Sequence, residues 1–407
     1  MCGIAGAVNY RLSYPTIKSV MGHRGPDEQN GIQVDRVDFY HLRLSILDIS
    51  GGKQPMQLHN RFTIIFNGEI YNYKELKQRF SIQTQTNSDT EVLLHLYEKM
   101  GDKMLQELDG MFVMAIYDSK EKELFLCRDR AGEKPLYYYI DGEKFVFASE
   151  LNSLKALLPL EIYNDNFAHY LRFGAFYKEH TPYKKVKELV AGSWMKLNCE
   201  NLDNQVTKWW SIQPFFQESH SLDLNQTINK TEDLLDLSVK RRIESSDLEV
   251  GCFLSGGIDS ALVTAFASRY TPKLKTLTVS FEGQYDEAPL ARLMADKYKT
   301  FHTEVSINFD SLTNDVENIL AAYGEPLFDS SAIPSYYVSK AAKQLVTVVL
   351  TGDGADELFG GYRRHIPFFK HDFFQSSSTL RWMATQAKNM LPVSHEKKSI
   401  YNHLYRT

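Results

Sequence analysis

The chain opens with Met1-Cys2-Gly3-Ile4-Ala5-Gly6, and this stretch gives the strongest indication of both its fold and its chemistry. Removal of Met1 leaves Cys2 with a thiol and a free α-amine, whose ordinary pKa values are about 8.5 and about 7.7–8.0. The neutral amine can then accept the thiol proton, so that a single residue serves as nucleophile and base. A cysteine that follows methionine by chance is the alternative, and these six residues alone do not decide between the two.

The composition is typical of a soluble globular protein with two domains. The 407 residues are 43% hydrophobic and 24% charged, and the length exceeds that of one ordinary core. A formal net charge of −5 argues against nucleic acid and anionic membranes as partners. No apolar run approaches the roughly 18 residues of a membrane span, and the N-terminus lacks the pattern of a secretory signal.

The cysteines indicate a reducing compartment. They stand at positions 2, 127, 199 and 252, with neither disulfide-type nor metal-type spacing. We therefore expect a cytoplasmic protein, in which an N-terminal thiol stays usable.

The first half of the chain is dominated by strands. Short runs rich in β-branched and aromatic residues predict strands at 4–8, 61–66, 110–117, 123–127, 136–140 and 144–148. Two helical stretches, 73–80 and 89–100, lie among them. Many antiparallel-looking strands with interspersed helices predict an α+β domain over residues 1–205.

Residues 206–407 show the alternating rhythm of an α/β domain. Strands are predicted at 249–255, 275–281, 301–307 and 346–351, and helices at 260–270, 287–298, 309–323 and 332–345. This alternation predicts a parallel, doubly wound sheet with a ligand crevice at the carboxyl ends of its strands. The segment 371–407 carries no motif that indicates a function.

Polar residues in the first half supply parts for cleaving an amide. Asn67-Gly68 follows an apolar strand and offers an amide and an N–H to an oxyanion, although Asn-Gly is also a common turn. Arg43 could clamp a carboxylate, and a surface strand arginine is its alternative. Asp89 could accept from an ammonium, whereas Ser88 or Asp89 as a helix N-cap explains the same residues. Together with Cys2, these groups favour hydrolysis of an amino-acid side-chain amide.

Two loops of the second half suit a nucleotide. Ser255-Gly256-Gly257-Ile258-Asp259-Ser260 lies at a strand-to-helix junction, where small residues expose N–H groups and hydroxyls to a phosphate. The lysine-bearing phosphate loop is absent. Asp259 beside such a cradle suits Mg²⁺, and a capping carboxylate is the alternative. The glycine-rich loop 351–362 follows the strand predicted at 346–351. It carries Asp353 and Asp356, which suit metal binding and proton removal better than packing, and solvated loop acids are the alternative.

The first-half motifs resemble those of class II glutamine amidotransferases. The matching segments are Cys2-Gly3-Ile4, His23-Arg24-Gly25-Pro26-Asp27, Arg43-Leu44-Ser45, Asn67-Gly68-Glu69-Ile70-Tyr71-Asn72 and Ser88-Asp89. The run Arg128-Asp129-Arg130-Ala131-Gly132-Glu133-Lys134-Pro135-Leu136-Tyr137 is similar to the asparagine synthetase branch. The resemblance implies an N-terminal-nucleophile hydrolase with an αββα sandwich. It also implies that Cys2 attacks glutamine, Asn67 and Gly68 hold the oxyanion, Arg43 binds the carboxylate, and Glu69 and Asp89 bind the ammonium.

The second-half loops resemble the ATP-pyrophosphatase domain of asparagine synthetases, an adenine nucleotide alpha hydrolase-like fold. The resemblance implies that ATP and Mg²⁺ bind here. The implied ATP-binding residues are Ser255, Gly256, Gly257, Asp259, Ser260, Val279, Thr351 and Gly352, with Asp259 and Asp356 on the metal. Asp353 stands where many members carry a glutamate that removes a proton, and it is one methylene shorter.

The resemblance ends near residue 365. No lysine-bearing helical stretch like that of the family follows Tyr362, so we expect a C-terminally incomplete chain or a shortened member with an impaired synthetase step. The predicted activity is that of a glutamine-dependent ligase that converts aspartate to asparagine and yields AMP, pyrophosphate and glutamate. Amidation of another carboxylate, such as a polysaccharide uronic acid, and a glutaminase without synthetase activity are the alternatives. A homodimer is an assembly that the sequence leaves open.

Overall fold

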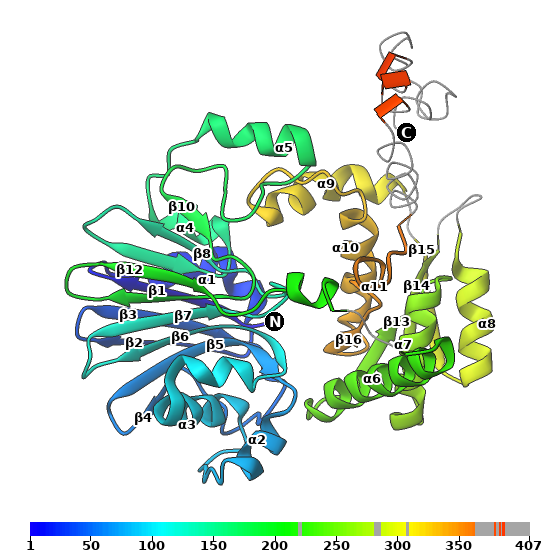
Figure 1. Ribbon diagram of the computed structural model, residues 1–407, viewed down its shortest axis with the longest axis horizontal. Helices are drawn as coiled ribbons and strands as arrows, with labels where there is room; N and C mark the ends of the chain where they lie inside the picture. The colour runs from blue at the N-terminus through cyan, green and yellow to red at the C-terminus, as the bar shows by residue number, and fades with distance from the viewer. Residues whose placement is uncertain are drawn as a thin grey trace.

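The computed structural model describes residues 1–218, 222–280, 286–306 and 309–362, without the side chains of 309–314, and also 378–379, 382–383 and 385–386. Two stacked sheets form one part of the molecule, and a smaller sheet flanked by helices forms the other (Figure 1). The segment 371–407 and the stretch expected after Tyr362 lie almost entirely outside the described residues.

The first part consists of two six-stranded antiparallel sheets. The first sheet has the order β10 (Val186–Glu188), β8 (Tyr137–Ile140), β9 (Phe145–Ala148), β1 (Gly3–Val8), β3 (Val37–Arg43) and β2 (Glu28–Val34). The second sheet has the order β12 (Asn204–Lys208), β11 (Ser193–Asn198), β7 (Glu123–Arg128), β6 (Gly110–Asp118), β5 (Phe62–Ile70) and β4 (Met56–Leu58).

Helices cover the outer face of each sheet and complete four layers (Figure 1). Helices α1 (Tyr14–Met21) and α4 (Leu151–Leu157) pack on the first sheet, and α2 (Tyr73–Arg79) and α3 (Asp89–Met100) pack on the second. The remaining helical turns of this part are η1 (Gly22–Arg24), η2 (Gly101–Gln106), η3 (Asn164–Asn166), α5 (Phe167–Phe173) and η4 (Gln213–Phe216). This arrangement confirms the predicted αββα sandwich.

The layer between the sheets is apolar and tightly packed. It contains Ile4, Phe39 and Phe147 of the first sheet and Ile65, Val113 and Tyr117 of the second. β1 is buried along its whole length, because helices cover one of its faces and the second sheet covers the other. This double burial explains why β1 reads as a continuous apolar run.

The second part is a four-stranded parallel sheet with helices on both faces, which confirms the predicted doubly wound domain. Its order is β15 (Phe301–Ser306), β14 (Lys275–Ser280), β13 (Val250–Phe253) and β16 (Val348–Leu350). One face carries α6 (Leu224–Glu244), α7 (Ile258–Tyr270) and α8 (Ala288–Tyr298), and the other carries α9 (Phe309–Tyr323) and α10 (Ala332–Ala342). The short α11 (Ala355–Phe359) follows β16.

Three features differ from the sequence-based prediction. β5 runs through Asn67 and Gly68 to Ile70, so this pair lies inside a strand and not in a turn. Helix α6, 21 residues long, was not predicted, because its sequence is polar and only Val239 is buried. β12 pairs with β11 as far as Lys208, and the predicted division between residues 205 and 206, which stays a prediction, falls within it. Within the described ranges, no helix is both long and apolar enough to cross a bilayer.

The end of α6 joins the two parts through charged contacts. Arg241 pairs through Nη1 with Asp109 Oδ2 at 2.6 Å and through Nη2 with Glu75 Oε2 at 2.7 Å. The guanidinium of Arg242 lies 4.4 Å from the ring centroid of Tyr71. These contacts hold the second part against the edge of the sandwich at which β5 ends.

A glycine in β1 tests the packing between the sheets. A Cβ at Gly6 would lie 2.3 Å from Phe147 Cζ and 2.9 Å from Phe39 Cδ1. We expect Gly6→Ala to lower the free energy of unfolding by about 1–3 kcal/mol, as overpacking of a core does, measured by urea denaturation. Gly22→Ala is the control, because its Cβ would meet only Lys18 Cγ at 3.9 Å, and it should change stability by less than about 0.5 kcal/mol. Equal stability of the two variants would contradict the prediction.

Candidate active site

The thiol of Cys2 lies just before the first residue of β1 and is held by Leu44, the residue that follows β3. Its Sγ accepts from the Leu44 N–H at 3.4 Å and contacts the Leu44 carbonyl oxygen at 3.6 Å. Arg24 Nε donates to the Cys2 carbonyl at 3.0 Å, and Arg24 Nη1 pairs with Glu150 at 3.0 Å. Burial raises the pKa of the thiol, so a nearby base must take its proton.

The α-amine at this end of the chain is suited to that role. Burial lowers its pKa to about 6, and the cations Arg24 and Lys134 contribute in the same direction. An amine in these surroundings is mainly neutral at pH 7 and can accept a proton. With Met1 in place the amine belongs to Met1, so removal of Met1 is required to bring amine and thiol together on Cys2.

The oxyanion donors predicted from the sequence lie on β5. The Phe66 N–H donates to Gln54 Oε1 at 2.6 Å and the Ile70 N–H to Asp89 Oδ2 at 3.0 Å, so the alternation of the strand places the Gly68 N–H on the same edge. Asn67 is buried, and within the described part of the chain its Nδ2 has no hydrogen-bond partner. A buried donor without an acceptor is rare in proteins and indicates a missing ligand atom.

Two carboxylates lie near these donors. Glu69 follows Gly68 on β5, and Asp89 is the first residue of α3. Burial and the charge of Asp89 raise the pKa of Glu69 well above its ordinary value, and Glu69 Oε2 lacks a partner among the described residues. Burial raises the pKa of Asp89 to about 6, against the hydrogen bonds that it accepts from Ile70, Thr90 and Ser88. A substrate ammonium would stabilise the ionised form of both acids. Ser88 is the N-cap of α3, as one of the alternatives held.

Arg43 is buried and is not the surface arginine of the alternative interpretation. Its Nη2 donates to the Asp48 carbonyl at 2.7 Å, and its Nη1 donates to the Ile49 carbonyl at 3.0 Å and pairs with Glu28 at 3.3 Å. The guanidinium therefore fixes the segment that follows β3. Its predicted role as a clamp for a substrate carboxylate stays a prediction.

A cavity of about 440 Å³ lies at the carboxyl ends of β13 and β16. Eight predicted residues line it: Ser255, Gly257, Asp259, Ser260, Thr351, Gly352, Asp353 and Asp356. Unpredicted lining comes from Phe253, Ser335, Val338, Ser339, Gly354, Glu357 and Tyr362. Gly256 and Val279 are not in the lining: the Gly256 N–H donates to Glu287, and Val279 packs against the apolar cluster around Leu277.

The two loops of this cavity touch each other. Ser260 Oγ accepts from the Ser255 N–H at 3.0 Å and lies 2.9 Å from Ser255 Oγ, which holds the turn before α7 in place. A Cβ at Gly352 would lie 2.8 Å from the Ser260 nitrogen, so only glycine allows this approach. The N-terminus of α7 and the hydroxyls beside it form a cradle suited to phosphate.

The carboxylates of this cavity fit Mg²⁺ that is shared with a phosphate. Within the described ranges, His, Cys, Asp and Glu nowhere gather in groups of three or more that could hold a metal on their own. Asp259 and Asp356 line the same cavity as the serine hydroxyls. Because Mg²⁺ keeps several waters and takes one or two carboxylates beside substrate phosphates, this donor set suits it.

Another cavity, of about 530 Å³, lies between the two parts of the molecule. On the side of the sandwich it is lined by Met1, Arg24 and Glu150 among others. Its other side includes Ser335 and Ser339 of α10, which also line the cavity at the carboxyl ends of β13 and β16. The space beside the N-terminus and the nucleotide-type cavity therefore share one helix as a wall.

Comparison with known proteins identifies two families along the chain. Residues 1–210 match the glutamine amidotransferase domain family, and residues 230–404 match the asparagine synthase family. The resemblance therefore continues past residue 365, where the sequence motifs alone placed its end. The chain is 34% identical to a protein named putative asparagine synthetase [glutamine-hydrolyzing] 2 of Methanocaldococcus jannaschii, with 99% of this chain and 83% of that relative covered. The chain belongs to the glutamine-hydrolysing asparagine synthetase family.

Two further asparagine synthetases are similar. Asparagine synthetase [glutamine-hydrolyzing] 1 of Bacillus subtilis is 33% identical over 98% of this chain, and asparagine synthetase B of Escherichia coli is 30% identical over 89%. This chain spans 65% of the length of each of the two. The family assignment confirms the predicted pairing of a glutamine amidotransferase domain with an asparagine synthetase domain.

Several residues around the candidate site were not assigned roles from the sequence. His41 is buried, its Nε2 donates to the Phe66 carbonyl at 3.1 Å, and burial lowers its pKa to about 4, so it is neutral. Lys134 Nζ lies 3.0 Å from Met111 Sδ, and burial lowers its pKa. Lys134 belongs to the family motif at 128–137, but Glu150 has no local signature that could have revealed it.

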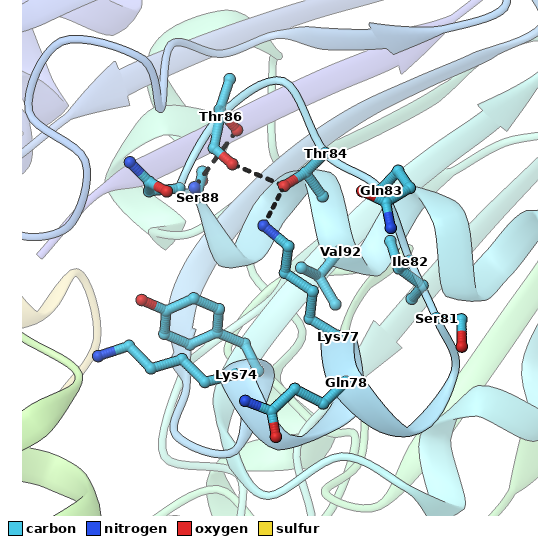
Figure 2. Close-up of a pocket in the computed structure, with 12 residues that line it drawn as sticks. Lys74, Lys77, Gln78, Ser81, Ile82, Gln83, Thr84, Thr86, Ser88 and Val92 are labelled. Atoms are coloured by element: carbon cyan, nitrogen blue, oxygen red, sulfur yellow. Dashed lines mark hydrogen bonds between the residues drawn. The ribbon is translucent and has the colours of Figure 1, made fainter.

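A separate hollow of about 600 Å³ lies beside α2 (Figure 2). Lys77 Nζ donates to Thr84 Oγ1 at 2.6 Å, and Thr84 Oγ1 donates to the Thr86 carbonyl at 2.7 Å, as the dashed lines in Figure 2 show. Ser88 also lines this hollow, which therefore borders the start of α3 from outside. None of the predicted nucleophile, oxyanion or nucleotide residues lines it.

The raised pKa of Asp89 predicts a pH-dependent stability. With a folded pKa of about 6 against the ordinary 3.8, the folded protein binds this proton more tightly, so stability is lost as pH rises from about 4 to about 6. Relative to the wild type, Asp89→Asn should gain about 1–3 kcal/mol of unfolding free energy between pH 4 and pH 7, measured by urea denaturation. The exposed Asp203→Asn is the control, with changes below about 0.5 kcal/mol. A pH-independent difference for Asp89→Asn would contradict the assignment.

Proposed function

We propose that this protein is a glutamine-dependent amide ligase. It hydrolyses glutamine at Cys2 and passes the ammonia to a carboxylate that ATP has activated as an acyl-adenylate. The observation that carries the proposal is the shared wall: Ser335 and Ser339 line both the cavity that contains Met1 and the cavity of the phosphate-type loops. Ammonia released beside the N-terminus would thus enter a space that borders the second site.

In the first half-reaction the thiolate of Cys2 attacks the side-chain amide carbon of glutamine. The α-amine that Cys2 carries after removal of Met1 takes the thiol proton and returns it to the departing ammonia. Asn67 Nδ2 and the Gly68 N–H donate to the oxyanion, and the unpartnered state of Asn67 Nδ2 among the described residues supports this role. Water then cleaves the thioester and releases glutamate.

The ends of glutamine are held by charge. Glu69 and Asp89 receive its α-ammonium, and the raised pKa of each, caused chiefly by burial, indicates that a cation would relieve the cost of their ionisation. Arg43 takes the α-carboxylate in this proposal, while it keeps its contacts with the Asp48 and Ile49 carbonyls. The planar guanidinium can donate to more than one oxygen at once.

In the second half-reaction a carboxylate oxygen attacks the α-phosphorus of ATP and releases pyrophosphate. The 255–260 loop and the N-terminus of α7 hold the departing phosphates. Ammonia then displaces AMP to give the amide, with Asp353 as the acceptor of its proton. Mg²⁺, held by Asp259 and Asp356, would neutralise phosphate charge when bound. Aspartate is the proposed acceptor, because the similar proteins are named asparagine synthetases.

The glutaminase half is tested at the nucleophile and the oxyanion donor. Cys2→Ala should abolish the release of glutamate from glutamine, because it removes the attacking atom. Asn67→Ala should lower kcat about 10²- to 10³-fold, the usual loss for one oxyanion donor. The exposed Asn204→Ala is the matched control and should leave kcat unchanged. Glutamate release by Cys2→Ala at the wild-type rate would overturn the assignment.

The ligase half is tested by product balance. With glutamine, aspartate, ATP and Mg²⁺, the protein should form AMP and asparagine in equal amounts, measured by chromatography. Asp356→Asn should reduce AMP formation at least about tenfold and spare glutamate release, because it weakens only the phosphate and metal site. AMP formation with a uronic acid but not with aspartate would reassign the acceptor. Glutamate release without AMP for either carboxylate would leave a glutaminase only.

A further inference from the structure

The turn after α6 reaches across to the sandwich and grips the segment that follows β3. The Asp247 N–H donates to the Ile46 carbonyl at 3.0 Å, and Asp247 Oδ2 accepts from the Asp48 N–H at 2.8 Å. One residue of the second domain thus brackets three residues of the first. The two hydrogen bonds fix both the position and the direction of this short segment.

The bracketed residues lie within the segment 44–49, and both ends of this segment contact residues of the proposed glutaminase site. At its start, Leu44 contacts the thiol of Cys2 through its N–H and its carbonyl. At its end, the guanidinium of Arg43 is surrounded by the carbonyls of Leu47, Asp48 and Ile49. A shift of the segment would therefore move Arg43, the proposed carboxylate site.

Asp48 extends the contact to the ammonium side of the site. Its Oδ2 accepts from the Asn87 N–H at 2.8 Å, and its Oδ1 accepts from the Gly51 N–H at 3.0 Å. Asn87 directly precedes Ser88, the N-cap of the helix whose first residue is Asp89. A chain of hydrogen bonds thus runs from Asp247 through Asp48 to the start of α3.

The negative charge of Asp247 also acts on the region of the proposed ammonium site. The carboxylate of Asp247 lies close enough to Glu69 to raise its pKa, after the larger effects of burial and Asp89. Asp247 also raises the pKa of Tyr73, together with Asp89, after burial. The second domain therefore adds a negative charge to the region that a substrate ammonium would occupy.

We propose that Asp247 is a positioning residue for glutamine binding, supplied by the synthetase domain to the glutaminase domain. The inference rests on the proposed glutaminase function. Asp247 acts through the 44–49 segment and through Asp48 on the groups that hold the two ends of glutamine. Cys2 itself stays fixed by Arg24 and by β1, so the loss of Asp247 should weaken binding of glutamine more than it slows the chemical step.

The junction offers a matched control for this role. Arg241 joins the same helix to the sandwich through Glu75 and Asp109, and none of its hydrogen bonds or ion pairs reaches the 44–49 segment. Removing Arg241 loosens the domain contact without releasing that segment. A difference between the two variants therefore separates positioning of the loop from simple loss of domain contact.

Steady-state glutamine hydrolysis by the full chain tests the proposal. Asp247→Ala should raise KM for glutamine about 3- to 10-fold, the range for loss of a hydrogen bond, with kcat within about twofold of the wild type. Asp247→Asn keeps an oxygen that can accept from the Asp48 N–H and should recover most of the lost affinity. Arg241→Ala should keep KM within about twofold. Thermal melting of each variant checks that the fold is retained, and Asp247→Ser replaces the alanine variant if that one does not fold.

Three outcomes would overturn the inference. An unchanged KM in Asp247→Ala, or in Asp247→Ser, would show that the contact does not position the site. An equal rise in KM for Arg241→Ala would assign the effect to general loosening of the domains. A fall in kcat with KM unchanged would place Asp247 in the chemical step. If the wild type itself releases no glutamate, the proposed function fails, and this result is distinct from the other three.

Discussion

A nucleophile at the end of a chain works only if that end is held still, and chain termini ordinarily fray. β1 solves this problem because it pairs with β3 on one side and β9 on the other, in the middle of the first sheet. Its residues are buried on both faces, and the backbone of Leu44, the residue after β3, contacts the thiol of Cys2. The proposed oxyanion donors on β5 and the acids Glu69 and Asp89 can act on a substrate only if this end of the chain stays in place.

The second constraint is the concentration of incompletely satisfied polar groups around that end. Arg24, Asn67 and Glu69 each have a buried atom without a partner in the described part of the chain. Such groups cost stability in the free protein, since burial without hydrogen bonds is unfavourable. A zwitterionic substrate with an amide offers an acceptor for the donors and a cation for the acid. The free site thus stores a cost that binding of the substrate relieves.

Much of the fold was predictable because local patterns and tertiary structure agree. The strands of the sandwich and the alternation of the second domain follow from apolar periodicity. The strand before Asn67-Gly68 was predicted to end at residue 66, and it continues to Ile70 because pairing with β6 overrides the turn preference of this dipeptide. Helix α6 was missed because a mostly exposed helix has little apolar periodicity to detect.

Residues of the candidate site could be proposed from the sequence only where family motifs mark them, and their roles stay predictions. Cys2, Asn67 and Asp89 fall in such motifs, and Asp89 accepts a hydrogen bond from Ile70, the last residue of the strand that carries Asn67. The burial of Arg43 could not be foreseen, because its partners are backbone carbonyls, which leave no trace in side-chain identity. Contacts such as that of Arg24 with Glu150 join residues far apart in the chain and become visible only in three dimensions.

Helix α10 has a property that follows from its place between two cavities. Ser335 and Ser339 are one turn apart, so they lie on the same side of the helix and expose hydroxyls, not bulky side chains, to both spaces. Val338 of the same helix faces one of the cavities and Tyr336 faces the other, so the two serines are the positions at which α10 offers hydroxyls to both. Where the two cavities adjoin at α10, a small polar molecule therefore meets hydroxyl groups with which it can form hydrogen bonds.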